Sequence, residues 1–162
     1  MKKRIILLAN LFLFLGLQVV NAQATQQECT IKYNLFKGDY QSKKYDDAFP
    51  NWMYLMDNCQ KLSINIYKLG DKLAQARFKD AADKTEAAVL VNRVYQQRLE
   101  NFPTKDPAKV HSDYATFLVK NKLASDDEVF EILQLAYSID PNRMGVKIIY
   151  RYFQGITDAN KD

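Results

Sequence analysis

The sequence predicts an all-α protein, and three observations support this prediction. Only 5 glycines and 4 prolines occur in 162 residues, which is few for a protein built on many tight β-turns. Apolar residues recur at helical spacing along most of the chain. No segment alternates apolar and polar residues for long enough to form a strand. A hydrophobic content of 48% fits a packed domain, and the length fits one domain better than two.

Residues 1–24 have the three parts of a secretory signal, so we expect them to be removed. A basic start precedes an apolar run from Ile5 to Leu17, and alanines follow at the positions that a signal peptidase reads. We expect cleavage after Ala24, with Ala22 as the alternative. A membrane anchor is the competing interpretation, but this run is shorter than the roughly 20 residues that span a bilayer.

Signal removal changes the charge argument. The whole chain has a net charge of +4, and residues 1–24 contain Lys2, Lys3, Arg4 and no acid. The mature chain is therefore nearly neutral and lacks the strongly basic balance of a nucleic-acid-binding protein. We expect an exported protein, periplasmic or secreted, with no nucleic-acid partner and no transmembrane segment after cleavage.

The first predicted helix pair extends from Glu28 to Cys59. Its expected apolar positions are Ile31, Leu35 and Phe36 in the first helix and Ala48, Trp52, Leu55, Met56 and Cys59 in the second. Two such helices joined by a tight turn form an αα-hairpin, in which the start of the first lies beside the end of the second. We therefore predict a Cys29–Cys59 disulfide in an exported chain, with two free buried thiols as the alternative.

Two further pairs follow, and local signals mark their ends. Residues 64–77 and 80–100 are predicted as the second pair. Asp106 before Pro107 predicts an N-cap with proline at the first helical position. Residues 125–128 form a capping box for the next helix, which Pro141 ends. The expected core positions are Ile66, Tyr67, Leu69, Gly70, Leu73, Ala76, Ala87, Leu90, Val91, Val94, Tyr95, Leu99, Val110, Tyr114, Phe117, Leu118, Val129, Ile132, Leu133 and Ala136.

The last predicted helix, starting near Asn142, is apolar on two faces. We expect one face to pack on the core, with Val146, Ile149, Tyr150, Phe153 and Ile156. We expect Ile148 and Tyr152 to form a second, outward strip. The end of a helical solenoid is normally polar because it meets solvent. This strip therefore predicts a contact with a partner, with a second copy of the chain, or with a following segment.

The pairs resemble tetratricopeptide repeats, whose helix pairs carry small and large apolar residues at fixed offsets before a proline. The matching residues are Leu35, Tyr45, Ala48, Trp52 and Leu55 in the first unit, Leu69, Gly70, Leu73, Tyr95 and Pro103 in the second, and Ala136, Ile139, Asp140 and Pro141 in the third. The first unit departs from the pattern, with Gln60 at the proline position and Pro50 early in its second helix. The middle unit is longer than the usual period.

The resemblance implies one tetratricopeptide-like domain over residues 25–162, forming a short α-solenoid of about seven helices in antiparallel hairpins. Its units would be residues 30–60, 63–103 and 109–141, followed by a terminal helix over 142–157. Exported bacterial proteins of this class mostly bind peptides or other proteins. The resemblance therefore implies a protein or peptide partner in the cell envelope.

The side chains that usually carry chemistry do not form a site in this sequence. The two cysteines are far apart, and His111 is the one histidine, so no group has zinc-ligand spacing. Consecutive helical residues point about 100° apart, so His111, Ser112 and Asp113 cannot converge as a triad. Acids at 46–47 and 126–128 are expected at helix starts, where the dipole favours them. We expect no catalytic, metal or cofactor site, and we place His111 at the surface or as a cap.

We therefore predict a non-catalytic protein-binding or scaffold module of the cell envelope. Tyr40, Lys43 and Lys44 are the residues that we expect at a binding surface, together with the outward strip of Ile148 and Tyr152. The main alternative is a structural subunit that self-assembles, or packs on a further domain, through its terminal helix. An enzyme of unfamiliar type and a nucleic-acid binder are weaker alternatives.

Overall fold

A computed structural model describes residues 24–160, so all of the predicted signal segment except Ala24 lies outside the described residues. Seven α-helices and one short 3-10 helix make up this part of the chain, which has no strand. The elements are α1 (Gln26–Gln41), α2 (Tyr45–Asn58), α3 (Asn65–Asp80), α4 (Lys84–Asn101), α5 (Pro107–Asn121), α6 (Asp126–Ile139), η1 (Pro141–Arg143) and α7 (Val146–Ala159). The all-α prediction is confirmed.

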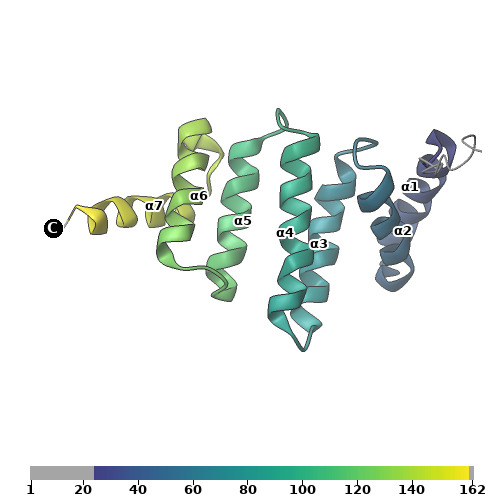
Figure 1. Ribbon diagram of the computed structural model, residues 1–162, viewed down its shortest axis with the longest axis horizontal. Helices are drawn as coiled ribbons and strands as arrows, with labels where there is room; N and C mark the ends of the chain where they lie inside the picture. The colour runs from purple at the N-terminus through teal and green to yellow at the C-terminus, as the bar shows by residue number, and fades with distance from the viewer. Residues whose placement is uncertain (1–23, 161–162) are drawn as a thin grey trace, which may run out of the picture.

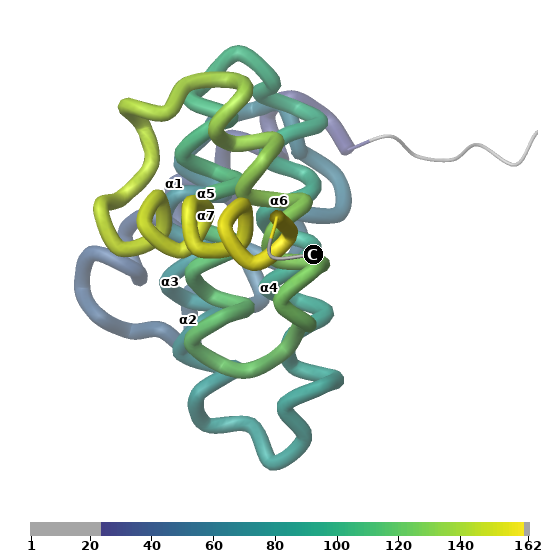
Figure 2. Tube along the Cα trace, turned by 90° about the vertical axis from the view of Figure 1, so that its left-hand side faces the viewer, coloured from purple at the N-terminus to yellow at the C-terminus, as the bar shows by residue number. Residues whose placement is uncertain are grey.

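The helices form a short solenoid-like row (Figure 1). α1 packs on α2, α3 on α4 and α5 on α6, and the successive pairs stack side by side. α7 breaks the pattern because it lies crosswise at the C-terminal end of the row, as the end-on view shows (Figure 2). The predicted arrangement of antiparallel hairpins is thus confirmed, with α7 as a closing element.

Helix starts follow the predicted local signals in most places. Ser125 and Glu128 form the predicted capping box at the start of α6. Pro107 begins α5 as expected, but Asp106 makes no side-chain capping bond and adopts a left-handed backbone conformation with φ 65°. Its carboxylate instead accepts hydrogen bonds from Arg143. A contact between distant parts of the chain has replaced the local cap.

The first pair contains the predicted disulfide. Cys29 near the start of α1 is bonded to Cys59 just after α2, and their Cα atoms are 5.7 Å apart. Phe36 is fully buried, but Ile31 and Leu35 are 51% and 48% exposed, so the expectation that they face the core was wrong. α1 is the first helix of the row and packs mainly on α2, so only a narrow stripe of its surface is covered.

The junction between the first and second pairs depends on a close contact at Gly70. Trp52 of α2 is fully buried, and its Nε1 donates to the Ile66 carbonyl of α3 at 2.9 Å. A Cβ atom on Gly70 would lie 2.5 Å from Trp52 Cε2, which is closer than atoms pack. Glycine is therefore needed here so that the indole can approach α3 this closely.

The core of α3 to α6 largely matches the predicted positions. Of the expected residues, Ile66, Tyr67, Gly70, Leu73, Val91, Val94, Tyr95, Val110, Phe117, Leu118, Val129, Leu133 and Ala136 are buried, and most others are half-buried. Ala76 is exposed, which corrects one position of α3. Ala74 and Phe78 are buried in its place, since they share a face with Gly70 and Leu73.

The orientation of α7 is opposite to the prediction. Ile148 and Tyr152 are buried at 7% exposure each, whereas Val146, Tyr150 and Phe153 are 84%, 64% and 47% exposed. The Tyr152 ring stacks on Phe130 and Tyr137 of α6, with centroids 5.5 and 4.8 Å apart. Residues 141–143 form a 3-10 turn, so α7 begins at Val146 rather than near Asn142. Ile148 and Tyr152 therefore belong to the core and not to an outward partner surface.

Candidate functional site: the groove between α3 and α5

Two open hollows lie between α3 and α5, the first helices of the second and third pairs. The larger, which we call the Arg98 hollow, has a volume of about 740 Å³ and is bordered by Lys68, Arg98, Lys105, Asp106, Lys109 and Arg143, among others. The smaller, which we call the lysine hollow, has a volume of about 610 Å³ and is bordered by Lys72, Phe78, Lys79, Lys84, Phe117 and Lys120, among others. We call the two together the α3–α5 groove.

The two hollows follow one another along the same two helices. On α3 the bordering lysines run from Lys68 to Lys79, and on α5 they run from Lys109 to Lys120. At about 1.5 Å per helical residue, each span covers about 16 Å. An extended polypeptide rises about 3.3 Å per residue, so the groove has the length of roughly five residues of extended chain.

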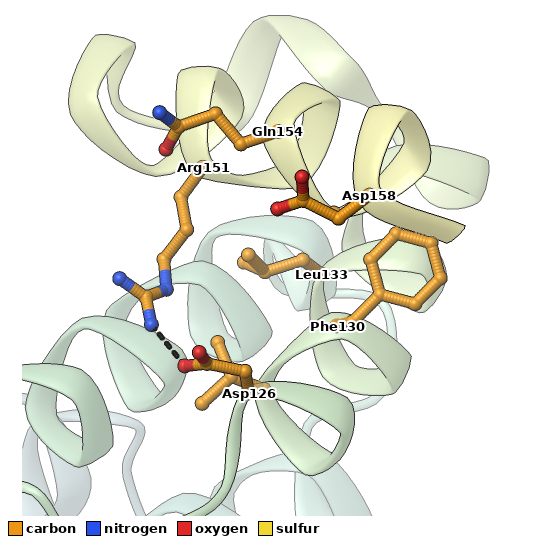
Figure 3. Close-up of a pocket in the computed structure, with 8 residues that line it drawn as sticks. Asp126, Phe130, Leu133, Arg151, Gln154 and Asp158 are labelled. Carbon is orange, nitrogen blue, oxygen red and sulfur yellow. Dashed lines mark hydrogen bonds and ion pairs between the residues drawn. The ribbon is translucent and has the colours of Figure 1, made fainter. Parts of the chain in front are cut away.

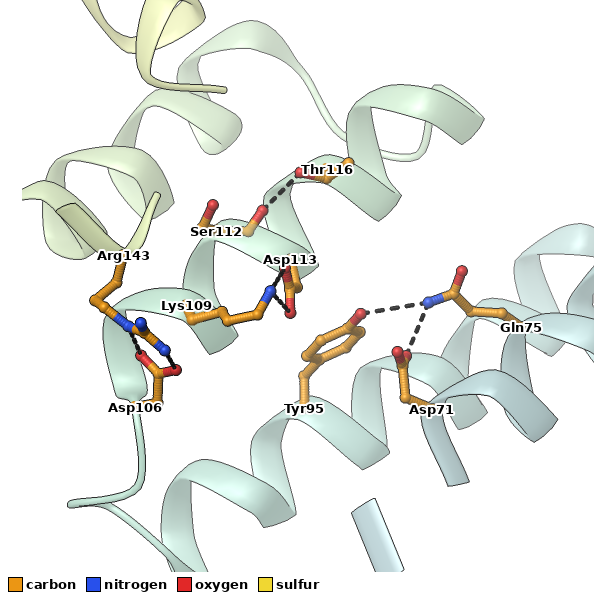
Figure 4. Close-up of polar contacts among 9 residues, drawn as sticks. All are labelled: Asp71, Gln75, Tyr95, Asp106, Lys109, Ser112, Asp113, Thr116 and Arg143. Carbon is orange, nitrogen blue, oxygen red and sulfur yellow. Dashed lines mark hydrogen bonds and ion pairs between the residues drawn. The ribbon is translucent and has the colours of Figure 1, made fainter. Parts of the chain in front are cut away.

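A hydrogen-bonded cluster lies where the two hollows meet (Figure 4). Gln75 Nε2 of α3 donates to Asp71 Oδ1 at 2.8 Å and to the Tyr95 hydroxyl oxygen of α4 at 3.4 Å. Burial raises the pKa of Tyr95 well above its ordinary value of 10, and the negative charge of Asp71 raises it further. The Tyr95 side chain therefore stays neutral and offers a hydroxyl group rather than a charge.

Two of the acids that border the Arg98 hollow are paired with cations of the same chain. Lys109 Nζ donates to both carboxylate oxygens of Asp113, at 2.7 and 2.9 Å. Arg143 Nε donates to Asp106 Oδ1 at 2.9 Å, and its Nη2 donates to Oδ2 (Figure 4). This hydrogen bonding lowers the pKa of Asp106 below its ordinary range. Each of these two carboxylates is therefore already paired with a cation of the same chain.

Arg98 is the one buried charged side chain among the described residues. It lies in the last turn of α4, borders the hollow and is only 9% exposed. Its Nε has no hydrogen-bond partner, and none of the described residues forms an ion pair with its guanidinium. The helix dipole favours a cation at this end, but by about 1 kcal/mol or less at most sites. A buried charge without a partner costs several times that.

The lysine hollow combines basic and aromatic surface. Lys72, Lys79 and Lys120 are exposed at its border, and no acidic residue lines it. Phe78 and Phe117 meet edge to face with their centroids 5.0 Å apart. This hollow therefore presents apolar surface next to cations that have no acid beside them.

The surface residues predicted from the sequence lie outside the two hollows. Lys43 and Lys44 are exposed in the turn between α1 and α2. Tyr40 is half-buried, and its ring contacts Phe36 and Tyr45. Burial raises the pKa of Tyr40, and the negative charges of Tyr45 and Asp71 raise it further by smaller amounts.

Sequence reasoning missed the groove, although one signal was available. Lys68, Lys72 and Lys79 of α3 are separated by four and seven residues, which places them on one side of a helix. Lys109 and Lys120 are eleven residues apart on α5, the same separation as Lys68 and Lys79. Such matched spacing in two helices that head consecutive repeat units indicates a shared basic face.

A smaller pocket of about 180 Å³ lies between α6 and α7 (Figure 3). Arg151 of α7 reaches across it to Asp126 at the start of α6. A Cβ atom on Gly155 would lie 2.5 Å from Phe130 Cδ2, so α7 approaches α6 closely here. The contacts around this pocket hold α7 against α6, and the pocket has no room for a sizeable ligand.

The residues considered for catalysis or metal binding do not converge. His111 is half-buried, and burial lowers its pKa. Asp113, its neighbour in the sequence, is bound to Lys109 instead. Within residues 24–160, no group of three or more histidine, cysteine or acidic side chains is placed to hold a metal ion. In the same part of the chain, no helix has the length and apolar character to cross a membrane.

Comparisons with known proteins found no matching family model, no matching curated protein and no matching solved structure. The α3–α5 groove, with its buried arginine and exposed lysines, is thus the feature on which a function can be proposed.

Proposed function

We propose that this chain is a non-catalytic, exported binding module of tetratricopeptide-like architecture. In this proposal the α3–α5 groove holds an extended segment of a partner protein. The observation that carries it is the alignment of two open hollows along the same two helices. Stacked helix pairs create extended surfaces of this kind, and repeat proteins commonly use them for binding.

The chemistry of the groove also favours binding over catalysis. A catalytic site needs a nucleophile or base held beside a second group that activates it. The groove instead offers ion pairs already made within the fold, a neutral Tyr95 and lysines spread over about 16 Å of helix. Dispersed charges next to aromatic surface suit recognition of a polypeptide.

The disulfide supports the proposal that the protein is exported. Disulfides persist in oxidising compartments and are rare in the reducing cytosol. The Cys29–Cys59 bond and the predicted signal at residues 1–24 both favour the periplasm or the extracellular space. Within such a compartment, we propose a scaffold or adaptor role in the cell envelope.

Site-specific photo-crosslinking tests the groove directly. A photoreactive amino acid would replace either Lys72 in the groove or Gln96 on the exposed side of α4, each in the exported full chain. We expect the Lys72 probe to crosslink one envelope protein in living cells, and the Gln96 probe to crosslink nothing specific. Capture through Gln96 alone, or no capture from Lys72, would overturn the proposal.

Self-assembly through α7 is a second candidate, because α7 exposes an apolar strip. Val146, Tyr150 and Phe153 form this strip, in place of the predicted Ile148 and Tyr152. If it mediates assembly, light scattering after size exclusion will show an oligomer that Tyr150→Glu converts to a monomer. A monomeric wild-type chain would eliminate this candidate and leave the groove proposal intact.

A further inference from the structure

We propose that the Arg98 hollow is a carboxylate-binding site, which receives an acidic side chain of the bound partner segment. This inference rests on the proposed function and deepens it, since it names the chemistry that the groove recognises. The inference starts from Arg98, and the other residues that border the hollow determine which ligands can reach its guanidinium group.

The first step is a comparison of the arginines. Five lie in the described part of the chain, and four of them form an ion pair with an aspartate. These four are Arg77, Arg93, Arg143 and Arg151. Arg98 is more buried than they are, yet it forms no ion pair. Buried guanidinium groups are normally matched by an acid, so Arg98 lacks the partner that its position requires.

The second step is that no acid among the described residues forms an ion pair with Arg98. After the hydrogen bonds from Arg143, the charge of Arg98 also lowers the pKa of Asp106, but Arg143 already binds that carboxylate. Asp106 is held by Arg143, Asp113 by Lys109, and Asp71 accepts from Gln75. These are the three acids that border the hollow. Because the acids that border the hollow already bind other side chains, we place the acid that pairs with Arg98 on the bound partner segment.

The third step concerns the chemistry of that acid. A guanidinium group presents parallel N–H donors that match the two oxygens of a carboxylate. Lys68 and Lys105 are exposed at the border of the hollow, where they attract an approaching anion. The lysines therefore attract a carboxylate toward the hollow, and the guanidinium group matches its two oxygens once it is bound.

The fourth step identifies the source of the carboxylate as a polypeptide. The groove continues from the Arg98 hollow into the lysine hollow, where Phe78 and Phe117 lie near exposed lysines and no acid. A free small anion would use only the first hollow. An extended segment with two acidic residues and an apolar side chain would use both.

The test uses labelled hexapeptide pools and the mature chain, residues 25–162. One pool has two fixed glutamates and randomised other positions, and the matched pool has glutamines at the fixed positions. Fluorescence anisotropy should show at least tenfold tighter binding of the glutamate pool by wild type. Arg98→Met should abolish this preference. Arg93→Met, the same change on the same helix, should keep it, because Arg93 pairs with Asp57 on the α2 side.

Thermal unfolding separates binding from folding. Arg98→Met removes a buried charge that forms no ion pair, so we expect its Tm to stay the same or rise, whereas a structural role would lower it. The glutamate pool should raise the Tm of wild type but not of Arg98→Met. If the variant fails to fold, the glutamate pool should still raise the Tm of wild type more than the glutamine pool does, and this comparison needs only wild-type protein.

Two results would overturn this proposal. One is equal binding of the two pools by wild type, and the other is an unchanged glutamate preference in Arg98→Met. Inorganic phosphate is the third ligand tested, after the two peptide pools. If phosphate binds in an Arg98-dependent way and the glutamate pool does not bind, the site receives a free anion instead of a partner segment. If the Lys72 photo-crosslink captures a partner while the glutamate pool fails, the proposed function stands and the carboxylate inference falls.

Discussion

The two ends of the solenoid are closed in different ways. At the N-terminal end, the Cys29–Cys59 bond ties the start of α1 to the end of α2. At the C-terminal end, α7 lies crosswise and is held by stacked aromatic rings and by ion pairs. One end therefore depends on the redox state of its surroundings, and the other on packing and pH.

The difference shows two ways in which the terminal helices of this solenoid-like row are held. A helix at the end of a row has one neighbouring pair instead of two, so it buries less apolar surface. α1 leaves Ile31 and Leu35 exposed and has a covalent bond, whereas α7 leaves Val146 and Tyr150 exposed and has none. We expect α7 to be the more easily displaced of the two ends.

The largest expected effect is at the N-terminal end. The disulfide links residues 30 positions apart, and replacing it with Cys29→Ala and Cys59→Ala should reduce the free energy of unfolding by about 3–4 kcal/mol. The cause is the greater freedom of the unfolded chain once the link is absent. Urea titration with and without a reductant measures it. Reductant should destabilise wild type by the same amount and leave the double variant unchanged; no response of wild type would contradict the comparison.

The next largest expected effect is a loss of stability at the C-terminal end. It is tested by comparing substitutions of two tyrosines of α7. Tyr152→Ala removes a buried ring stacked between Phe130 and Tyr137, and should cost about 3 kcal/mol of local stability, within the range for buried aromatic truncations. Tyr150→Ala is the matched control, since this side chain is 64% exposed and its loss should cost under about 0.5 kcal/mol. Hydrogen exchange of the α7 amides measures both. Equal protection in the two variants would show that α7 is held in another way.

The smallest effect concerns the ion pair that anchors the turn before α7. Hydrogen bonds from Arg143 lower the folded-state pKa of Asp106 below its ordinary 3.8. The pair therefore contributes stability above pH 3.8, and this contribution disappears as the pH falls from there through the lowered folded-state pKa. Because the Arg143 side chain is 52% exposed, we expect about 1 kcal/mol or less.

The variant Asp106→Asn tests this acid dependence. Its stability should fall less steeply than that of wild type between pH 4 and the onset of acid unfolding, as measured by chemical denaturation at each pH. The disulfide-bonded first pair contains no part of this ion pair, so the Cys29→Ala and Cys59→Ala variant should keep the wild-type pH slope. An identical slope in Asp106→Asn and wild type would assign the acid sensitivity to other groups.

Local patterns in the sequence were enough to predict the helices, most of their ends and the disulfide. Ser125 and Glu128 cap α6 because a capping box needs only residues three apart. The Cys29–Cys59 pair follows from two helices of similar length joined by a tight turn. The buried face of α2 could also be read directly, since its buried residues form one apolar stripe. In α4 the periodicity predicted Val91, Val94 and Tyr95 correctly but did not predict that Arg98 is buried beside them.

Only the tertiary structure decided which face of a terminal helix is covered and which charges remain without a partner. α7 is apolar on two sides, and its packing on Phe130 and Tyr137 of α6 buries Tyr152, while Tyr150 stays exposed. Asp106 binds Arg143, 37 residues away, whereas Arg98 forms no ion pair with any described acid. Periodicity along one helix specifies its possible faces, but the choice among them, and the pairing of charges between helices, depends on contacts between residues far apart in the chain.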